Sequence, residues 1–249
     1  MAERAAIVTG ASSGIGLALA RMLGEEGYGL TIASRRPEKL EPAAEELRSA
    51  GFEVEALPAN LGTADSEGEV QKVVNAHRER FGRLDVLCNN AGVGIGATVD
   101  EIQTKRMDIQ LYTNFRQIVL FYREAMDMLK AAGAEHRNAN VINTSSISGK
   151  NAEAWLSVYS ATKHAVVGWT QAMNKELGPL GIKNCALCPA FVDTPMTDFV
   201  KGQVPPESMI TTQDIAEMVR GLLKLSPGCV IPEIIFDRPG GGLPLGGEG

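Results

Sequence analysis

Short apolar segments rich in β-branched residues recur along the chain and alternate with longer segments whose apolar positions follow a helical spacing. The short segments predict β-strands at residues 5–9, 28–34, 52–58, 85–89, 140–144, 182–188 and 230–236. The longer segments include predicted helices at residues 15–26, 37–50, 65–81, 155–177 and 212–225. Strand and helix therefore alternate throughout, which is typical of an α/β protein.

The alternation also predicts how the strands are joined. Parallel neighbours need a crossover between them, and right-handed crossovers wind the chain outward from the first strand. We therefore expect a doubly wound parallel sheet of about seven strands with helices on both faces.

Length and composition predict a single domain. The chain has 249 residues, of which 44% are hydrophobic, and this is enough apolar material for one sizeable core. No Pro/Ser-rich linker, internal repeat or change in composition divides it. We expect one domain over residues 1–238, followed by a mobile glycine-rich tail at residues 239–249.

Charge and hydropathy narrow the classes of partner. The formal net charge is -6, and Lys and Arg form no block along the chain. Such a chain offers no basic patch to a polyanion, so neither nucleic acid nor a membrane surface is an expected partner. The amino terminus lacks the features of a signal peptide, and no apolar run is long enough to span a bilayer. We therefore expect a cytoplasmic protein.

Neither the cysteines nor the histidines indicate a metal site. Cys185 and Cys188 form a C-x-x-C pair, but they lie in a predicted strand, where residues three apart point to opposite faces. No second cysteine pair accompanies them, and the three histidines form no ligand cluster. Plain packing is therefore favoured over redox or metal chemistry, and no bound metal is expected.

A glycine-rich turn joins the first predicted strand to the first predicted helix, and residues 9–16 read Thr-Gly-Ala-Ser-Ser-Gly-Ile-Gly. Glycines permit a tight turn and a close approach of backbone to a pyrophosphate, while the helix N-terminus attracts negative charge. An ordinary strand-to-helix turn is the alternative, because glycine spacing alone is a weak signal. The predicted nucleotide contacts are Gly10, Ser12, Ser13, Gly14, Ile15 and Gly16.

The second predicted strand ends at Ser34, Arg35 and Arg36, where an NAD-binding protein would usually carry an acidic residue for the adenosine ribose. Two guanidinium groups instead offer fork-shaped donors suited to a 2′-phosphate, which favours NADP(H) as the cofactor. The alternative is a solvated basic turn, although cations at the following helix start oppose the helix dipole. Arg35 is the stronger candidate because it directly follows the ribose-facing position.

Tyr159 and Lys163 are four residues apart on a predicted helix and therefore share one face. An ammonium beside a phenol stabilises the phenolate and lowers the pKa of the phenol toward a useful range. Such a pair alone is common. Ser146, however, lies thirteen residues earlier at the end of the fifth predicted strand, at the sheet edge where ligands bind. Ser145 stays an alternative, because a shift of one residue reverses the direction of the side chain.

Taken in order, these segments resemble the short-chain dehydrogenase/reductase family. The turn at residues 9–16 is similar to the family's TGxxxGxG loop, and Asn89-Asn90-Ala91-Gly92 is similar to its NNAG segment. Ser146, Tyr159 and Lys163 match its S…YxxxK arrangement. The resemblance runs from Ile7 to about Thr194 and implies a Rossmann-like fold with a nicotinamide cofactor.

The resemblance implies further cofactor contacts. Asn60 and Leu61 stand where the family has Asp followed by Val or Leu beside the adenine, and Asn60 keeps hydrogen-bonding capacity without the charge. Residues 189–194 are similar to the family's PGxVxT segment, with an alanine, at position 190, in place of glycine. If that position needs a positive φ, we expect a modest backbone adjustment. The contacts that this resemblance implies are Asn60, Leu61, Asn90, Ala91, Gly92, Tyr159, Lys163, Pro189, Val192 and Thr194.

The same resemblance implies catalytic roles. Ser146 would hydrogen-bond the substrate oxygen, Tyr159 would act as the acid/base, and Lys163 would also hold the nicotinamide ribose. Asn114 would be the fourth catalytic member, positioning a water for proton relay to the lysine. For Asn114 the alternative is structural: an asparagine within a helix also bends the helix or hydrogen-bonds a neighbouring one. For Asn89 the alternative is bracing of the sheet.

The expected function is hydride transfer between NADP(H) and a carbonyl/alcohol pair, with reduction of a ketone or aldehyde as the expected direction. Residues at about 195–211 would form a lid whose apolar content indicates an uncharged or partly hydrophobic substrate. A catalytically silent NADPH-binding regulatory protein and an epimerase or dehydratase of the same family are the alternatives. The family resemblance also implies a homodimer or homotetramer.

Overall fold

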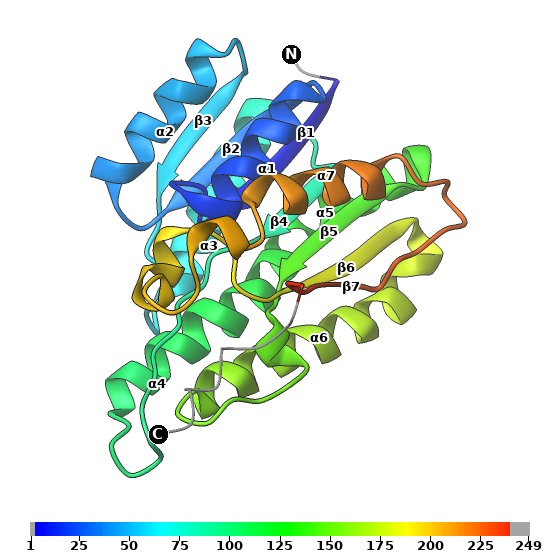
Figure 1. Cartoon of the computed structure of the whole chain (residues 1–249). Helices are drawn as coiled ribbons and strands as arrows, with labels where there is room; N and C mark the ends of the chain where they lie inside the picture. Colours follow the sequence, from blue (N-terminus) through cyan, green and yellow to red (C-terminus); the bar gives the residue numbers. More distant parts are fainter. Residues whose placement is uncertain (1–2, 240–249) are drawn as a thin grey trace.

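Seven parallel strands form a single sheet in the computed structural model, which describes residues 3–239 (Figure 1). The strands are β1 (Arg4–Thr9), β2 (Tyr28–Ser34), β3 (Val54–Pro58), β4 (Val86–Asn89), β5 (Ala139–Thr144), β6 (Ile182–Pro189) and β7 (Glu233–Phe236). Their order across the sheet is β3-β2-β1-β4-β5-β6-β7. The predicted α/β fold class is therefore confirmed, whereas residues 240–249 of the predicted tail lie outside the described part of the chain.

Helices cover both faces of the sheet. One face carries α1 (Gly14–Glu25), α2 (Pro37–Ser49) and α7 (Thr212–Leu223), and the other carries α3 (Ser66–Phe81), α5 (Gln117–His136) and α6 (Ser157–Leu177). The alternation along β1 shows how the sequence divides the core. Ala6 and Val8 pack into the first hydrophobic cluster, whereas Ile7 between them packs into the second.

The winding of the sheet reverses beside β1. This strand pairs with β2 on one side and with β4 on the other, so the crossovers move outward in both directions from it. In open parallel sheets the carboxyl ends of the strands at such a reversal form a crevice that binds ligands. The loops that follow β1, β2, β4, β5 and β6 all gather at this edge, because all seven strands run parallel.

The ends of the elements deviate from the predicted ranges for local reasons. α6 begins at Ser157 instead of residue 155, because Trp155 has left-handed backbone with a φ of 57°. β7 begins at Glu233, directly after Pro232, which has no amide hydrogen to donate to a ladder. Residues 104–136, for which no range was predicted, form α4 (Thr104–Leu111), a π-helical turn (Tyr112–Arg116) and α5.

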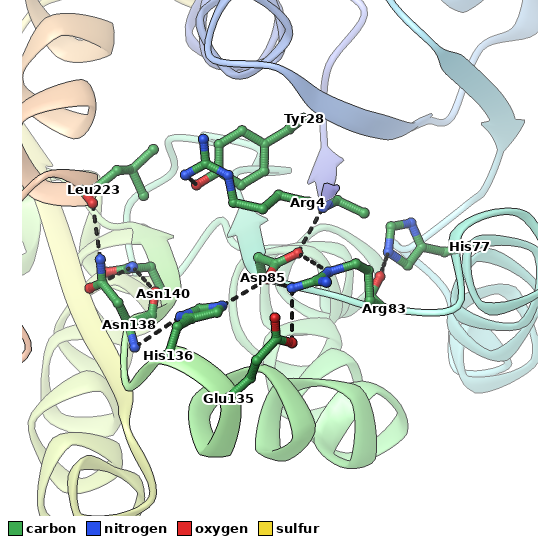
Figure 2. Close-up of polar contacts among 11 residues, drawn as sticks. Arg4, Tyr28, His77, Arg83, Asp85, Glu135, His136, Asn138, Asn140 and Leu223 are labelled. Atoms are coloured by element: carbon green, nitrogen blue, oxygen red, sulfur yellow. Dashed lines mark hydrogen bonds and ion pairs between the residues drawn. The ribbon is translucent and has the colours of Figure 1, made fainter. Parts of the chain in front are cut away.

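A buried carboxylate ties the elements together at the amino ends of the strands, opposite the site edge. Asp85 accepts hydrogen bonds from the Ala5 amide (2.8 Å), from the Arg83 guanidinium (2.7 and 2.9 Å) and from His136 Nε2 (3.0 Å) (Figure 2). Burial alone would raise the pKa of Asp85, but the hydrogen bonds from Arg83 and His136 outweigh it and lower the pKa. This network joins β1, the start of β4 and the end of α5.

The buried side chain of His77 makes the stability of the fold depend on pH. Its Nδ1 lies 2.7 Å from Thr31 Oγ1 and its Nε2 lies 2.8 Å from the Arg83 carbonyl oxygen. A carbonyl oxygen only accepts, so Nε2 carries the proton and Nδ1 accepts from the threonine. Burial lowers the pKa of His77 to about 4. The folded protein therefore holds this ring neutral.

We predict a loss of stability as the pH falls from 6.5 to about 4, because the unfolded chain takes up a proton that folded His77 refuses. The lost free energy of unfolding from this group is about 3 kcal/mol. Urea unfolding across this range should show a shallower pH dependence in His77→Gln than in the natural protein. Asp85 titrates below this window because its pKa is lowered, so equal slopes in the two proteins would contradict the assignment.

Candidate active site

The glycine-rich turn between β1 and α1 is folded tightly against the chain that follows β4. Gly10 and Gly14 have positive φ values of 66° and 57°. A Cβ atom on Gly10 would lie 2.9 Å from Ala91 Cα, and one on Gly16 would lie 2.4 Å from the Gly10 carbonyl oxygen. Larger residues are thus excluded at these positions, and backbone lines this part of the crevice.

Asn90 braces this turn through its side chain. Its Nδ2 donates to the Thr9 carbonyl (3.2 Å), and its Oδ1 accepts from Thr144 Oγ1 (3.1 Å). Thr9 Oγ1 in turn accepts from the backbone amides of Asn90 and Ala91, each at 3.0 Å. The neighbouring Asn89 donates to Asn143 Oδ1 (2.9 Å). Its side chain therefore braces the sheet, which is the structural role given above as the alternative to cofactor binding.

The start of α1 fits a phosphate group. Ser13 precedes the helix and makes no side-chain capping bond, and the first turn holds no acidic residue. The amides at this helix start therefore face the crevice with the positive end of the helix dipole. Ser12 lies beside them and its hydroxyl accepts from Ser34 Oγ (2.9 Å), which links the turn to the end of β2. Ile15 is half-buried against the first hydrophobic cluster.

A cavity of about 530 Å³ opens next to the end of β2. Both Arg35 and Arg36 are exposed, but only Arg35 lines this cavity, and Arg36 is the residue before α2. Neither arginine has an ion-pair partner among residues 3–239. Asn60 also lines the cavity, and its Oδ1 accepts from the Gly62 amide (3.3 Å). Leu61 is buried in the second hydrophobic cluster, so its side chain supports the wall.

Helix α4 supplies the opposite wall of this cavity, which the sequence patterns did not predict. Lys105, Asp108 and Ile109 of α4 line it together with Arg35, and Tyr112 of the π-helical turn lies beside them. The polar composition of residues 104–111 gives no apolar repeat that would have marked this helix, and nothing local places it opposite β2. The cavity therefore combines two cations and an aromatic ring, which can bind a phosphorylated adenosine, with one carboxylate, that of Asp108.

Ser146 and Tyr159 meet where β5 ends and α6 begins. The Ser146 hydroxyl accepts from the Ser148 amide (3.1 Å), and it is near enough to the Tyr159 hydroxyl to lower the pKa of that phenol. Ser145 Oγ points the other way and donates to the Lys163 carbonyl oxygen at 2.8 Å. Of the two serines, the structure therefore turns Ser146 toward the tyrosine.

Lys163 is buried directly behind this pair. Its Nζ donates to the Thr144 carbonyl (2.8 Å) and lies 5.6 Å from the centre of the Tyr159 ring. A Cβ atom on Gly92 would lie 3.4 Å from this Nζ and 3.5 Å from Asn114 Oδ1, so glycine leaves room there for both groups. Burial lowers the pKa of Lys163 to about 8.

The pKa of Tyr159 differs from the sequence-based expectation. Burial raises it above its ordinary value, and the hydrogen bond with Ser146 offsets only part of this rise. The expected lowering by the lysine ammonium is absent, because the ammonium is engaged with the Thr144 carbonyl and desolvation of the phenolate outweighs it. The phenol is therefore protonated at neutral pH and is poised to donate.

Asn114 lies in the π-helical turn before α5, a feature often found at functional sites. Its Oδ1 accepts from the Val93 amide (2.8 Å), and its Nδ2 donates to the Val93 carbonyl (2.9 Å) and to Thr162 Oγ1 (3.0 Å). The contact with α6 that the structural alternative expected is thus present. These bonds hold the chain at residues 92–97 against α6, beside Lys163.

The segment after β6 returns to the glycine-rich turn. Pro189 ends the strand, and Ala190 does not have a positive φ, so alanine is accommodated there without strain. Val192 pairs with Ile210, and the Thr194 methyl lies 3.0 Å from where a Cβ on Gly14 would be. These residues therefore border the crevice that the turn lines.

The lid predicted at about residues 195–211 is a separate small lobe at the same edge. It contains two short 3-10 turns, Pro195–Val200 and Pro206–Ser208. Val200, Val204 and Met209 pack against Phe191 in a cluster of their own, whereas Met196 and Phe199 are exposed. In Figure 1 this gold segment lies near α4, at the end of the sheet to which the strands point.

The two cysteines of the C-x-x-C pair lie within β6 and form no disulfide. Cys185 and Cys188 are free and belong to clusters on opposite faces of β6, which agrees with the packing prediction. Burial raises the pKa of both thiols, to about 12 and about 11. No helix within residues 3–239 is long and apolar enough to cross a membrane.

Comparison with known proteins places this site in a family. The model of the "short chain dehydrogenase" family matches residues 4–204. A putative ketoacyl reductase of Streptomyces coelicolor is 36% identical over 239 residues, covering 88% of this chain and 89% of the relative. A monensin polyketide synthase putative ketoacyl reductase of Streptomyces virginiae is 36% identical over 200 residues, covering 80% of this chain and 74% of the relative.

Solved structures agree with these relatives. A variant of actinorhodin polyketide ketoreductase with NADPH has a TM-score of 0.83 and 32% identity, covering 95% of this chain and 97% of that one. An alcohol dehydrogenase of Thermococcus sibiricus complexed with 5-hydroxy-NADP has a TM-score of 0.83 and 28% identity, covering 94% and 96%. The chain belongs to the short-chain dehydrogenase/reductase family, as its motifs predicted.

Proposed function

We propose that the chain is an NADPH-dependent carbonyl reductase that converts a ketone or aldehyde to the alcohol. The observation that carries this is that Ser146 and Tyr159 lie together beside buried Lys163, at the sheet edge that also holds the glycine-rich turn. Relatives named as ketoacyl reductases make ketoacyl compounds the first substrates to test. The silent regulatory protein and the epimerase or dehydratase are not favoured by these relatives.

The chain's own groups divide the chemistry at the substrate oxygen. Ser146 accepts a hydrogen bond from the Ser148 amide, so its hydroxyl hydrogen can turn from the Tyr159 oxygen to a substrate carbonyl oxygen. NADPH, held at this edge, would supply a hydride to the carbonyl carbon. Tyr159 gives its phenolic proton to the oxygen as negative charge develops there, and cationic Lys163 stabilises the phenolate that remains.

The same geometry supports a set of cofactor-binding residues. The amides at the start of α1 and the glycine-rich turn would hold the pyrophosphate, and Arg35 would hold the 2′-phosphate. Lys163 would hold the nicotinamide ribose. Asn114 would act mainly by fixing the chain at residues 92–97 near the lysine. A homodimer or homotetramer and a cytoplasmic location stay predictions.

Oxidation of NADPH in the presence of a panel of ketoacyl thioesters, cyclic ketones and aldehydes tests this function, with the products identified by mass spectrometry. We expect consumption of one NADPH for each alcohol formed. Tight NADPH binding without turnover on any compound would instead support the silent regulatory protein. A product of unchanged oxidation state would support the epimerase or dehydratase.

The pKa of Lys163 predicts the pH range of reduction. Because burial lowers this pKa to about 8, the ammonium is present below that pH and is lost as the pH rises through it. We expect kcat/KM for reduction to fall above about pH 8, since neutral lysine no longer stabilises the Tyr159 phenolate. Lys163→Arg, which stays charged, should be slower but should lose this falling limb. An unchanged limb in the arginine variant would contradict the assignment.

A further inference from the structure

Two exposed aromatic side chains face each other across the mouth of the site. Trp155 precedes α6 and Phe199 lies in the lid, with 46% and 66% of their surfaces exposed. Their ring centres are 6.3 Å apart and their planes are almost perpendicular, at 88°. Exposed large aromatic side chains that gather at one place usually mark a binding surface. The contact between the two rings brings together two segments that are far apart in the sequence.

The chain at residues 92–97 relates this pair to the reacting group. A Cβ atom on Gly94 would lie 3.7 Å from the Tyr159 ring, and one on Gly96 would lie 1.9 Å from a Trp155 ring atom. The Tyr159 ring therefore packs against Gly94, and the Trp155 ring packs against Gly96, two residues further along. Because two residues span at most about 7 Å, the Trp155 ring packs on this chain close to the Tyr159 ring.

Trp155 is held in this position at a conformational cost. Its φ of 57° is rare for a residue with a bulky side chain, and its carbonyl oxygen accepts from the Ala97 amide at 2.8 Å. Strained backbone that the surroundings maintain is characteristic of ligand-binding positions. The contact with Gly96 is possible only because that residue lacks a side chain.

The charges around the pair favour an uncharged ligand. Lys201 forms ion pairs with Asp193 (2.9 Å) and Asp198 (2.8 Å), so its charge is not free to bind an anionic ligand. Met196, next to them in the lid, is exposed as well. The surface that Trp155 and Phe199 present is therefore apolar and aromatic, and it is continuous with the site of reaction.

We propose that Trp155 and Phe199 form an aromatic clamp for the substrate, which is a ketone carrying a planar or bulky apolar ring close to its carbonyl group. With the carbonyl oxygen at Ser146 and Tyr159, the rest of the molecule extends along residues 94–96 to the two rings. Aromatic faces and edges bind ring systems better than thin acyclic chains. This assignment rests on the proposed reductase function, and it adds the residues that select the substrate.

Two ketones that differ only in the group beyond the carbonyl test the clamp: an aromatic bicyclic ketone and a short acyclic one. Phe199→Ala should raise KM for the bicyclic ketone about tenfold, the size expected for loss of an aromatic contact. kcat for the acyclic ketone should stay within about twofold. Met218→Ala, which removes an exposed apolar side chain on α7, is the matched control and should change neither value. Equal losses on both ketones would overturn the clamp.

Fluorescence gives a test that does not need turnover. The chain has two tryptophans, and the other one, Trp169, packs against Phe115 and Tyr122. Titration with the bicyclic ketone should quench the natural protein and leave Trp155→Phe unquenched. Quenching without turnover would support the clamp while contradicting the reductase function, and turnover without quenching would do the reverse. A change of oligomeric state in Phe199→Ala, measured by sedimentation, would instead assign this surface to a second copy of the chain.

Discussion

Tyr159→Phe is expected to lower kcat for ketone reduction by about 10²–10⁴-fold, the usual contribution of a positioned general acid. The phenol is the group with a proton to give, because burial keeps its pKa above the ordinary value. Phenylalanine keeps the ring that packs beside Gly94 and loses only the hydroxyl that meets Ser146. NADPH binding, measured by fluorescence titration, should therefore stay within about twofold.

Tyr122→Phe is the matched control for this change. Tyr122 is buried, whereas Tyr159 is half-buried, and the Tyr122 hydroxyl donates to Asn184 Oδ1 (2.8 Å) and accepts from Asn143 Nδ2 (2.8 Å), away from the crevice. Its loss should reduce the free energy of unfolding by about 1–3 kcal/mol and leave kcat nearly unchanged. Wild-type kcat in Tyr159→Phe, or equal kcat losses in the two variants, would remove Tyr159 from the proposed role.

Arg35→Ala is expected to weaken NADPH binding by about 10-fold to 100-fold while leaving NADH binding almost unchanged. Only NADPH carries the 2′-phosphate, and charge-assisted hydrogen bonds to such a group contribute about 1.5–3 kcal/mol each. Arg35 lines the cavity beside β2 and has no ion-pair partner among the described residues, so its charge is available. Binding constants for both cofactors, measured at one ionic strength, give the ratio.

Arg36→Ala separates this effect from a general loss of positive charge. Arg36 is exposed as the residue before α2 and does not line the cavity, so its removal should lower NADPH affinity much less. A larger effect at Arg36 would exchange the two assignments. Equal losses for NADPH and NADH in Arg35→Ala would show that the guanidinium does not read the 2′-phosphate.

The ends of most strands and helices could be predicted to within a few residues because the hydrophobic positions recur at regular spacings along the sequence. Buried parallel strands give short apolar runs, and the covering helices repeat their apolar positions every three or four residues. The deviations have local causes that periodicity does not report. Trp155 has a left-handed backbone conformation, so α6 begins after it, and β7 begins after Pro232. The helix at residues 104–111 is polar on most faces and gave no signal.

The site could be predicted only where its residues form local motifs. The glycine-rich turn and the pair of Tyr159 and Lys163 are each contained within one short segment. The contacts that complete the site are long-range: the Thr144 carbonyl meets Lys163, and Lys105 of α4 faces the end of β2. The prediction that the pKa of Tyr159 is lowered was wrong because the shift depends on burial, and this burial is created by parts of the chain that are distant in the sequence.

Transfer of deuterium from the reactive position of labelled NADPH tests the central claim most directly. When the natural protein reduces a ketone of the panel, mass spectrometry should find one deuterium at the carbinol carbon of each alcohol. Tyr159→Phe should bind the same labelled cofactor and form little or no labelled alcohol. Alcohol without deuterium, or tight NADPH binding with no alcohol from any carbonyl compound, would contradict the assignment of this chain as an NADPH-dependent carbonyl reductase.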